Sequence, residues 1–148
     1  MKRYIGFEMF QAEPMNFSVY YTEKNPNSKE VAQDAEGYKV EDPKGYISWV
    51  PKEVFEKCYM QVGDNFTIVD TNVNDFVADI EYQQWGDKTT IANATLANGF
   101  ILTESSSCVD PANFNMDIGQ GICKEKIYNE VWKLLGFLLQ TARYGIKK

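Results

Sequence analysis

The fold is decided by residues 88–141, KTTIANATLANGFILTESSSCVDPANFNMDIGQGICKEKIYNEVWKLLGFLLQT. Two runs rich in apolar residues, 89–96 and 100–103, lie on either side of Asn98-Gly99. Asn-Gly between such runs is the strongest short-range hairpin signal, because both central residues of a type I′ turn need φ > 0. After Asp110-Pro111, which should open a short helical turn, apolar residues recur every three to five positions. This spacing predicts one long helix with a single core-facing side.

The predicted core stripe of that helix consists of Ile118, Ile122, Ile127, Val131, Leu134, Leu138 and Ala142. Asn113 or Asn115 should cap its first turn. Gly119, Gly121 and Gly136 each cost about 1 kcal/mol relative to alanine inside a helix, so we expect either that another backbone approaches closely there or that the helix breaks near Gly121. The very apolar, glycine-bearing helix also predicts a homodimer or a higher oligomer.

The rest of the chain predicts further strands and helices. We expect strands at 2–12 and 66–69, a hairpin of 37–41 and 45–49 turned by Asp42–Gly45, and loops at 22–37 and 105–107. Helices are predicted at 52–60, with Val54, Phe55, Cys58 and Tyr59 inward, and at 74–84, capped by Asn74, with a short one possible at 29–35. The expected class is α+β, with antiparallel hairpins, helices packed on one face and a long C-terminal helix. The expected domains are 1–62 and 63–148.

Charge and hydropathy exclude several classes of protein. The net charge is −6 and the pI about 4.7, which argues against direct binding to nucleic acid or to an anionic membrane. No apolar run approaches the 18 residues of a membrane span, and residues 1–15 lack the apolar stretch of a signal peptide. Three widely separated cysteines fit a reducing compartment, so we expect the protein in the cytoplasm.

The residues that usually carry catalysis are scarce. The chain has no histidine, which removes the commonest general base and most transition-metal sites. Cys108, ahead of a helix, is a conceivable nucleophile, but a structural cysteine is the favoured interpretation. Asp64, Asp70 and Asp75 lack calcium-loop spacing. We therefore expect neither an enzyme nor a protein with a cofactor or metal.

Signals for binding are stronger, because 14% of the residues are aromatic. Tyr38, Tyr46 and Trp49 belong to one hairpin with Lys44 at its turn, a set suited to stacking on a purine or ribose ring. The alternative for Trp49 is a place in the core beneath helix 52–60. The serines at 105–107, ahead of a helix, could hold an anion, although a plain loop is commoner.

Part of the chain resembles a known family. Thr95-Leu96-Ala97-Asn98-Gly99-Phe100, the run from Ser106 to Phe114, Asp117-Ile118-Gly119 and the run from Val131 to Leu139 resemble the small phage-protein family named for a gene-49 and a gene-66 product, a domain of unknown function. The resemblance covers roughly residues 73–140. It departs from the family's usual residues at Glu104-Ser105, Gln120, Lys133 and Leu135.

The N-terminal part resembles a module found in many phage proteins. Tyr4-Ile5-Gly6, Ala12-Glu13-Pro14-Met15, Gly37-Tyr38-x-Val40 and the run from Gly45 to Tyr59 carry this similarity, with departures at Phe7 and Val50. In those phage proteins the module precedes gene-66-type domains, and it also precedes domains similar to the second Thoeris anti-defence family, which sequester a cyclic ADP-ribose-type signal.

The resemblance implies a phage accessory protein that antagonises host defence in the infected bacterial cytoplasm. The leading hypothesis is sequestration of a nucleotide-derived signal, such as a cyclic nucleotide or an ADP-ribose-type molecule. One alternative is an acidic protein inhibitor of a host defence nuclease, and another is a non-catalytic structural or interaction module. The predicted ligand-binding residues are Tyr38, Lys44, Tyr46, Trp49, Asn98, Phe100, Ser106 and Ser107.

Overall fold

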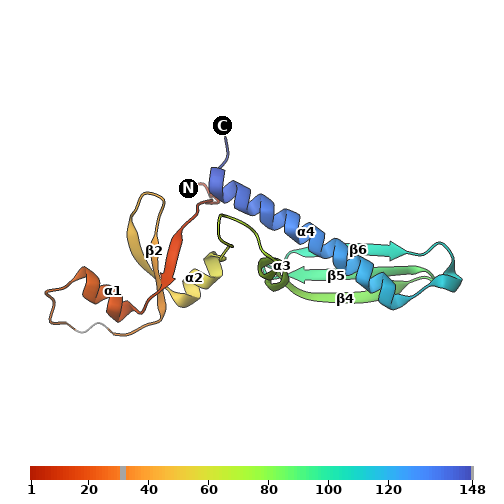
Figure 1. Ribbon diagram of the computed structural model, residues 1–148, viewed down its shortest axis with the longest axis horizontal. Coiled ribbons are helices and arrows are strands. Elements are labelled where there is room, and N and C mark those ends of the chain that lie inside the picture. Colours follow the sequence, from red (N-terminus) through yellow and green to blue (C-terminus); the bar gives the residue numbers. More distant parts are fainter. Residues whose placement is uncertain (31–32, 148) are drawn as a thin grey trace. The chain divides into compact units, whose positions relative to one another are not determined.

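The computed structural model describes residues 1–30 and 33–147. The chain divides into two compact units, one of Met1–Gln61 with Thr141–Lys148 and one of Val62–Gln140. Each unit contains its own three-stranded antiparallel sheet, and a long C-terminal helix is present, so the predicted α+β class is confirmed (Figure 1). We call these parts unit 1 and unit 2. The two units meet in the chain between Gln61 and Val62, one residue before the expected division between 62 and 63, and the segment from Thr141 onward groups with unit 1.

Unit 1 is a sheet of order β1-β2-β3, formed by β1 (Gln11–Pro14), β2 (Gly37–Glu41) and β3 (Ile47–Pro51). Helix α1 (Phe17–Lys24) follows β1, and α2 (Lys52–Cys58) follows β3. The predicted β2–β3 hairpin and its turn are confirmed, since the Gly45 amide donates to the Asp42 carbonyl at 2.9 Å. Gly45 has a φ of +81°, which only glycine adopts at little cost.

Three predictions for unit 1 are wrong. The first strand contains only the last residues of the predicted 2–12 segment, and helix α1 begins inside a stretch for which no helix was expected. On α2, Phe55 and Tyr59 pack inward, whereas Val54 and Cys58 are exposed. The possible helix at 29–35 includes residues 31–32, which lie outside the described part of the chain, and no regular structure is present at 29–30 or 33–35.

Unit 2 is a sheet of order β4-β5-β6 with one long helix against it. The strands are β4 (Val77–Trp85), β5 (Thr89–Leu96) and β6 (Ile101–Ser107), and the helix is α4 (Met116–Tyr144), which lies across the sheet in Figure 1. Along β5, alternate residues are buried, namely Thr90, Ala92, Ala94 and Leu96. They form one core with α4 and with Val73 of the short helix α3 (Asp70–Phe76).

The hairpin between β5 and β6 is confirmed, but its turn is of another type. Gly99 has a φ of +82°, whereas Asn98 does not have the positive φ that a type I′ turn requires. The Leu96 amide donates to Phe100 O, which leaves a three-residue loop with glycine in its left-handed position. Residues 105–107, predicted as a loop, extend β6, and the Thr89 and Ser107 hydroxyls lie 2.8 Å apart across the strands.

The predicted helix at 74–84 is also wrong. A helix of seven residues ends at Phe76, and β4 then runs for nine residues. Asn72, and not Asn74, satisfies the start of α3, since its side chain accepts from the Val69 amide at 3.0 Å. Ile80 and Tyr82 alternate with exposed polar residues, and this period of two is that of a strand. Pairing with β5 therefore overrides the helix that was predicted for this segment. The predicted strand at 66–69 is absent, and only an isolated bridge joins Gly63 to Thr67.

Helix α4 is confirmed, and its start is capped as expected. The Asn115 side chain accepts from the Ile118 amide at 3.1 Å, and η1 (Pro111–Asn113) forms the preceding turn. The buried side of α4 differs from the predicted stripe. It consists of Gly119, Cys123, Ile127, Val131 and Leu135, a strict step of four residues, because the helix follows a twisted sheet.

Candidate functional site

Two of the predicted aromatic ligands in unit 1 lie on opposite faces of its sheet. Lys39 pairs with Trp49 in the β2–β3 ladder, so Trp49 shares the face of Lys39 and Tyr38 lies on the other. The Trp49 ring contacts Phe17 of α1 with centroids 4.9 Å apart, and its Nε1 donates to Met15 O at 2.7 Å. Trp49 is thus a packing residue, beneath α1 and not beneath α2 as the core alternative supposed.

Tyr38 is part of an aromatic stack with α2. The centroid of its ring lies 4.1 Å from that of Phe55, and the Phe55 centroid lies 4.7 Å from that of Tyr59. The ring of Phe10 also contacts Tyr59, with centroids 5.1 Å apart. The Tyr38 hydroxyl donates to Glu56 Oε1 at 3.0 Å, and this bond raises the pKa of the tyrosine. These contacts hold α2 against the sheet.

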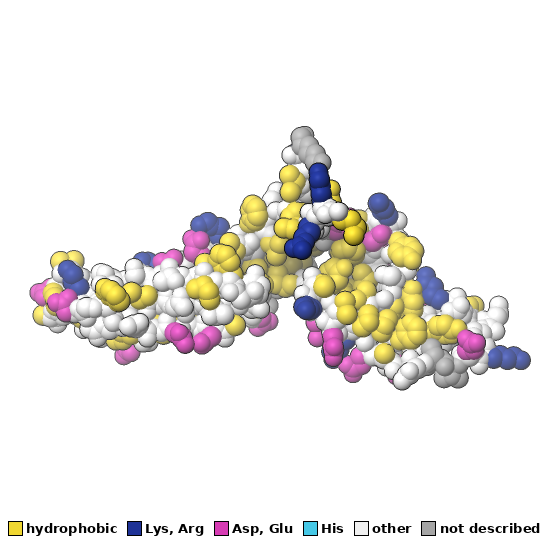
Figure 2. Space-filling view, turned by 180° about the vertical axis from the view of Figure 1, so that it is seen from behind, with side chains coloured by type: hydrophobic (Ala, Val, Ile, Leu, Met, Phe, Trp, Pro, Cys, Tyr) yellow, Lys and Arg dark blue, Asp and Glu magenta, His cyan; other side chains and the backbone are white. Residues whose placement is uncertain are grey.

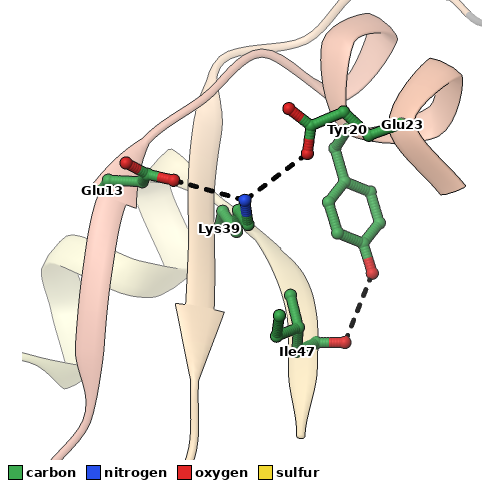
Figure 3. Close-up of polar contacts among 5 residues, drawn as sticks. All are labelled: Glu13, Tyr20, Glu23, Lys39 and Ile47. Carbon is green, nitrogen blue, oxygen red and sulfur yellow. Dashed lines mark hydrogen bonds and ion pairs between the residues drawn. The ribbon is translucent and has the colours of Figure 1, made fainter. Parts of the chain in front are cut away.

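The remaining polar contacts of this sheet fix α1. Lys39 lies 3.4 Å from Glu13 of β1 and 3.4 Å from Glu23 of α1, while the Tyr20 hydroxyl donates to Ile47 O at 3.4 Å (Figure 3). The hydrogen bond to Glu13, with the charge of Glu23, raises the pKa of Lys39. Since two carboxylates already neutralise this ammonium group, the cluster serves structure and offers no charge to a ligand.

The other predicted ligands do not converge. Lys44 and Tyr46 lie in the β2–β3 turn of unit 1, where both backbone amides donate to Asp42 Oδ1 and the Tyr46 side chain is 71% exposed. In unit 2, Asn98 and Phe100 lie before β6, while Ser106 and Ser107 lie at its far end, about 20 Å away at 3.3 Å per residue. As neighbours in a strand, Ser106 and Ser107 point to opposite faces, so no single pocket in unit 2 uses all four residues.

The structure instead presents a continuous surface on the sheet of unit 2. Helix α4 covers one face, and the opposite face carries four exposed or half-buried side chains from each strand. Figure 2 shows the molecule from behind Figure 1, with unit 2 at the left, mostly white with separate yellow and magenta side chains and a few dark blue ones. We call this surface the open face. It consists of Asp79, Glu81, Gln83, Trp85, Thr89, Ile91, Asn93, Thr95, Ile101, Thr103, Ser105 and Ser107.

Side chains of the open face are ordered across the strands. Thr103 Oγ1 donates to Asn93 Oδ1 at 2.8 Å, and the Thr89–Ser107 hydroxyl pair forms a second contact of this kind. Cross-strand pairing therefore sets hydroxyl and amide groups in a regular array, with Trp85 exposed at one corner. An ordered, shallow, polar surface suits another macromolecule better than a small ligand, which favours a concave site.

The open face carries carboxylates and no cation. Unit 2 holds eleven Asp and Glu against four Lys, a net charge of −7, whereas unit 1 holds ten against eleven, a net charge of +1. From residue 58 to residue 87 there is no Lys or Arg, and Asp70, Asp75, Asp79 and Glu81 are all exposed along α3 and β4. The acidity of the whole chain is therefore the acidity of unit 2.

The two cysteines of unit 2 both contact backbone carbonyl groups. Cys123 lies on the buried side of α4, with its Sγ 3.6 Å from Thr90 O, and burial raises the pKa of its thiol. Cys108 Sγ contacts Asp110 O at 3.1 Å, in a turn. Within residues 1–30 and 33–147, no three His, Cys, Asp or Glu side chains form a group that could hold a metal ion.

Comparison with known proteins assigns the family. Residues 50–143 match the model of the phage protein (N4 Gp49/phage Sf6 gene 66) family. The chain belongs to this family. No curated protein and no solved structure matches it.

The segment matched to the Gp49/gene 66 family contains every residue of the open face. Sequence reasoning missed this surface because residues 74–84 were interpreted as a helix. The signal was present: Asp79, Glu81, Gln83 and Trp85 recur at every second position, in alternation with Ile80 and Tyr82. None of the helices in the described part of the chain is both long and apolar enough to span a bilayer.

Proposed function

We propose that this phage protein acts in the infected cell by binding, and that the open face docks on a positively charged surface of a host defence protein. The observation that carries the proposal is the charge of unit 2. Its open face and the adjoining helix α3 present exposed carboxylates, and neither of them contains a lysine or arginine, although Lys88 lies in the turn between β4 and β5.

Electrostatic complementarity favours a basic partner over an anionic ligand. A surface with Asp79 and Glu81 and no lysine repels phosphate, whereas it attracts the lysine- and arginine-rich surfaces with which nucleases hold nucleic acid. Such an acidic protein competes with nucleic acid for the same basic groups. The hydroxyl and amide groups of β5 and β6 supply the hydrogen bonds that a protein interface of ordinary polarity uses.

The link to defence comes from the N-terminal module, whose sequence resembles the segment found in front of anti-defence domains. The absence of histidine from the whole chain supports binding over catalysis, because it removes the commonest general base. Together these features support an inhibitor of a host nuclease as the most specific form of the proposal.

The test compares two variants that each remove three negative charges. D75N/D79N/E81Q neutralises the surface of unit 2, and E8Q/E41Q/E53Q neutralises exposed carboxylates of unit 1 as the matched control. Immobilised wild type and control should capture a basic host protein in stoichiometric amount, and the first variant should bind it about tenfold more weakly. The loss should shrink between 50 and 300 mM salt, since salt screens exposed charges.

The same variants are then expressed in a host that carries a defence system. Wild type and control should restore plating of a phage that this defence blocks, and D75N/D79N/E81Q should not. Equal binding and equal plating by both variants would remove the open face from the function.

A nucleotide-derived signal is the second candidate, and one observation favours it. Tyr46 is largely exposed and lies beside Lys44 in the β2–β3 turn, so a ring and a cation remain available in unit 1. Cyclic nucleotides and ADP-ribose isomers should then raise the melting temperature, because a ligand that binds only the native state stabilises it. Y46A and K44A should abolish that rise, and no rise with any compound would end this candidate.

A further inference from the structure

Strand β4 forms a free edge of the sheet in unit 2. The strand order is β4-β5-β6, so within residues 62–140 β4 has a neighbouring strand on one side only (Figure 1). After a register shift between Val77 and Asp79, it pairs with β5 without interruption from Asp79 to Trp85. An edge strand carries unpaired backbone amides and carbonyls, which can receive a further strand. This regular stretch is longer than the typical strand of about five or six residues.

Hydrogen bonds at the end of β5 show which of its residues bond to which neighbour. The Leu96 amide donates to Phe100 O at 2.8 Å, so the even-numbered residues of β5 bond toward β6. The Ala97 amide donates to Phe76 O at 2.8 Å, so the odd-numbered residues bond toward β4. In an antiparallel ladder, bonded and non-bonded pairs alternate, which extends this assignment along the whole strand.

It follows that β4 turns the backbone groups of every second residue outward. Asp79 and Glu81 lie opposite odd-numbered residues of β5, so their amides and carbonyls point toward β5. The amides and carbonyls of Ile80, Tyr82 and Gln84 therefore point away from the sheet. Such a row of outward donors and acceptors is a template for one further strand.

The two edges of this sheet are protected differently. On β6, the Ser105 carbonyl accepts from Lys126 Nζ of α4 at 2.6 Å. A lysine at an edge opposes the addition of another strand. The sequence of β4, by contrast, contains neither lysine nor proline. The β4 edge is thus the one that remains open to pairing.

The two sides of the β4 edge differ in chemistry. On the open face, Asp79 and Glu81 are exposed carboxylates. On the opposite side, Ile80 and Tyr82 are half-buried and pack against the core, as does Tyr128 of α4. Side chains that lie opposite each other in paired strands are in contact. An added strand that matches this edge therefore carries cations on one side and apolar residues on the other.

We propose that the β4 edge binds an extended segment of the partner as an added antiparallel strand, in which lysine or arginine alternates with apolar residues. Its cations lie opposite Asp79 and Glu81, and its apolar side chains lie opposite Ile80 and Tyr82. The inference rests on the proposed function, because it names the part of the basic partner that the acidic surface holds. Main-chain hydrogen bonds supply the affinity of such a contact, and alternate side chains supply its specificity.

Charge disfavours a second copy of β4 as the added strand. A twofold pair centred on Tyr82 would satisfy the same outward backbone groups. It would also bring together Asp79 and Glu81 of both copies, and neither β4 nor β5 contains a cation to offset these four carboxylates. Like charges on paired strands are destabilising, whereas a basic strand neutralises them.

Fluorescence anisotropy with a synthetic peptide tests the strand addition on the full chain. The probe is TVTVKVKVT, labelled with fluorescein at its N-terminus and amidated, whose lysines lie opposite Glu81 and Asp79 in the antiparallel register. Replacing both lysines by glutamate should weaken binding at least about tenfold.

N-methylated probes separate strand addition from attraction between charges. Methylation of the two valine amides opposite Tyr82 and Ile80 removes the donors that pair with the edge carbonyls, and it should weaken binding at least about tenfold. Methylation of the two lysine amides is the matched control. These amides point away from β4, so binding should stay within about twofold of that of the unmodified probe.

Variants of the chain test the same contact from the other side. Q84P removes an outward amide and should weaken probe binding about tenfold, whereas the fold should persist, because an edge strand tolerates proline where its N–H faces solvent. D79N/E81Q should weaken binding to a similar extent. D117N/E125Q, which removes two exposed charges from α4, should not, and circular dichroism checks that each variant is folded.

The outcomes distinguish this inference from the proposed function. Equal effects of the two N-methylations, no binding of the probe up to about 1 mM, or a chain dimer that Q84P dissociates would overturn strand addition, even where D75N/D79N/E81Q still loses the host protein. Conversely, a strong effect of valine methylation alone supports strand addition, even where that triple variant captures the host protein as wild type does.

Discussion

Replacing Gly119 by alanine tests the closest contact between helix and sheet in unit 2. A Cβ at this position would overlap the Thr90 hydroxyl and lie 2.8 Å from Thr90 Cβ. Both residues are buried, and Thr90 belongs to the central strand, so neither can move aside freely. Gly121 lies on the same helix with nothing within 4 Å of its added Cβ, which makes it the matched control.

The expected magnitudes follow from two opposing terms. Either substitution gains about 1 kcal/mol of helix propensity. Overpacking a buried site costs about 1–3 kcal/mol, and the overlap with Thr90 places G119A at the upper end. We expect G119A to destabilise the protein by about 2 kcal/mol and G121A to stabilise it by about 1 kcal/mol.

Urea unfolding at constant m-value measures both changes, and the difference between the two variants cancels the propensity term. On heating, about 2–4 °C per kcal/mol corresponds to a loss of about 4–8 °C for G119A. In a T90G background, the G119A substitution should reduce the free energy of unfolding by less than it does in the wild type, since the two residues are in contact and their effects are coupled. The reasoning is refuted if G119A proves as stable as G121A.

Three further predictions concern single groups. N115A should cost about 1 kcal/mol by removing the cap of α4, while N113A changes stability by less than about 0.5 kcal/mol, as thermal melts can show. Because its carboxylate partners raise the folded-state pKa of Lys39, their stabilisation is present below the unfolded pKa and is lost as pH rises through the folded one. K39Q should therefore flatten the alkaline end of the stability profile, and an unchanged slope contradicts this. Cys58 should react with a thiol reagent at once and Cys123 only on unfolding, because Cys58 is exposed and burial raises the pKa of Cys123. Equal reaction rates of the two thiols, measured by absorbance, would contradict this prediction.

The assignments of function have different grounds. Membership of the Gp49/gene 66 phage family follows from the match over residues 50–143. The open face supports a basic partner because charge and exposure coincide on one surface.

Local pattern was sufficient wherever one short segment contains its own signal. Asn98-Gly99 predicted the hairpin, the spacing after Asp110-Pro111 predicted the long helix, and Asn115 was one of two expected caps. The turn Asp42–Gly45 is of the same kind. Each depends on backbone preferences or on hydrogen bonds within a few residues, and these are properties of the local sequence.

The tertiary structure decided which side of each element is buried. Along α4 the apolar pattern allowed two adjacent rows, and the twisted sheet selected Gly119, Cys123 and Leu135 over Ile118, Ile122 and Leu134. Segment 77–85 became a strand because the eight residues of β5 offered an edge to pair with. Tyr38 and Trp49 lie on opposite faces because Trp49 pairs with Lys39, and neighbours in a strand such as Tyr38 and Lys39 point to opposite sides. The sequence by itself determined the family, the long helix, the hairpins and the acidity of the chain. Only packing determined the open face and which apolar residues of α4 stay exposed, since burial depends on partners that are distant along the chain.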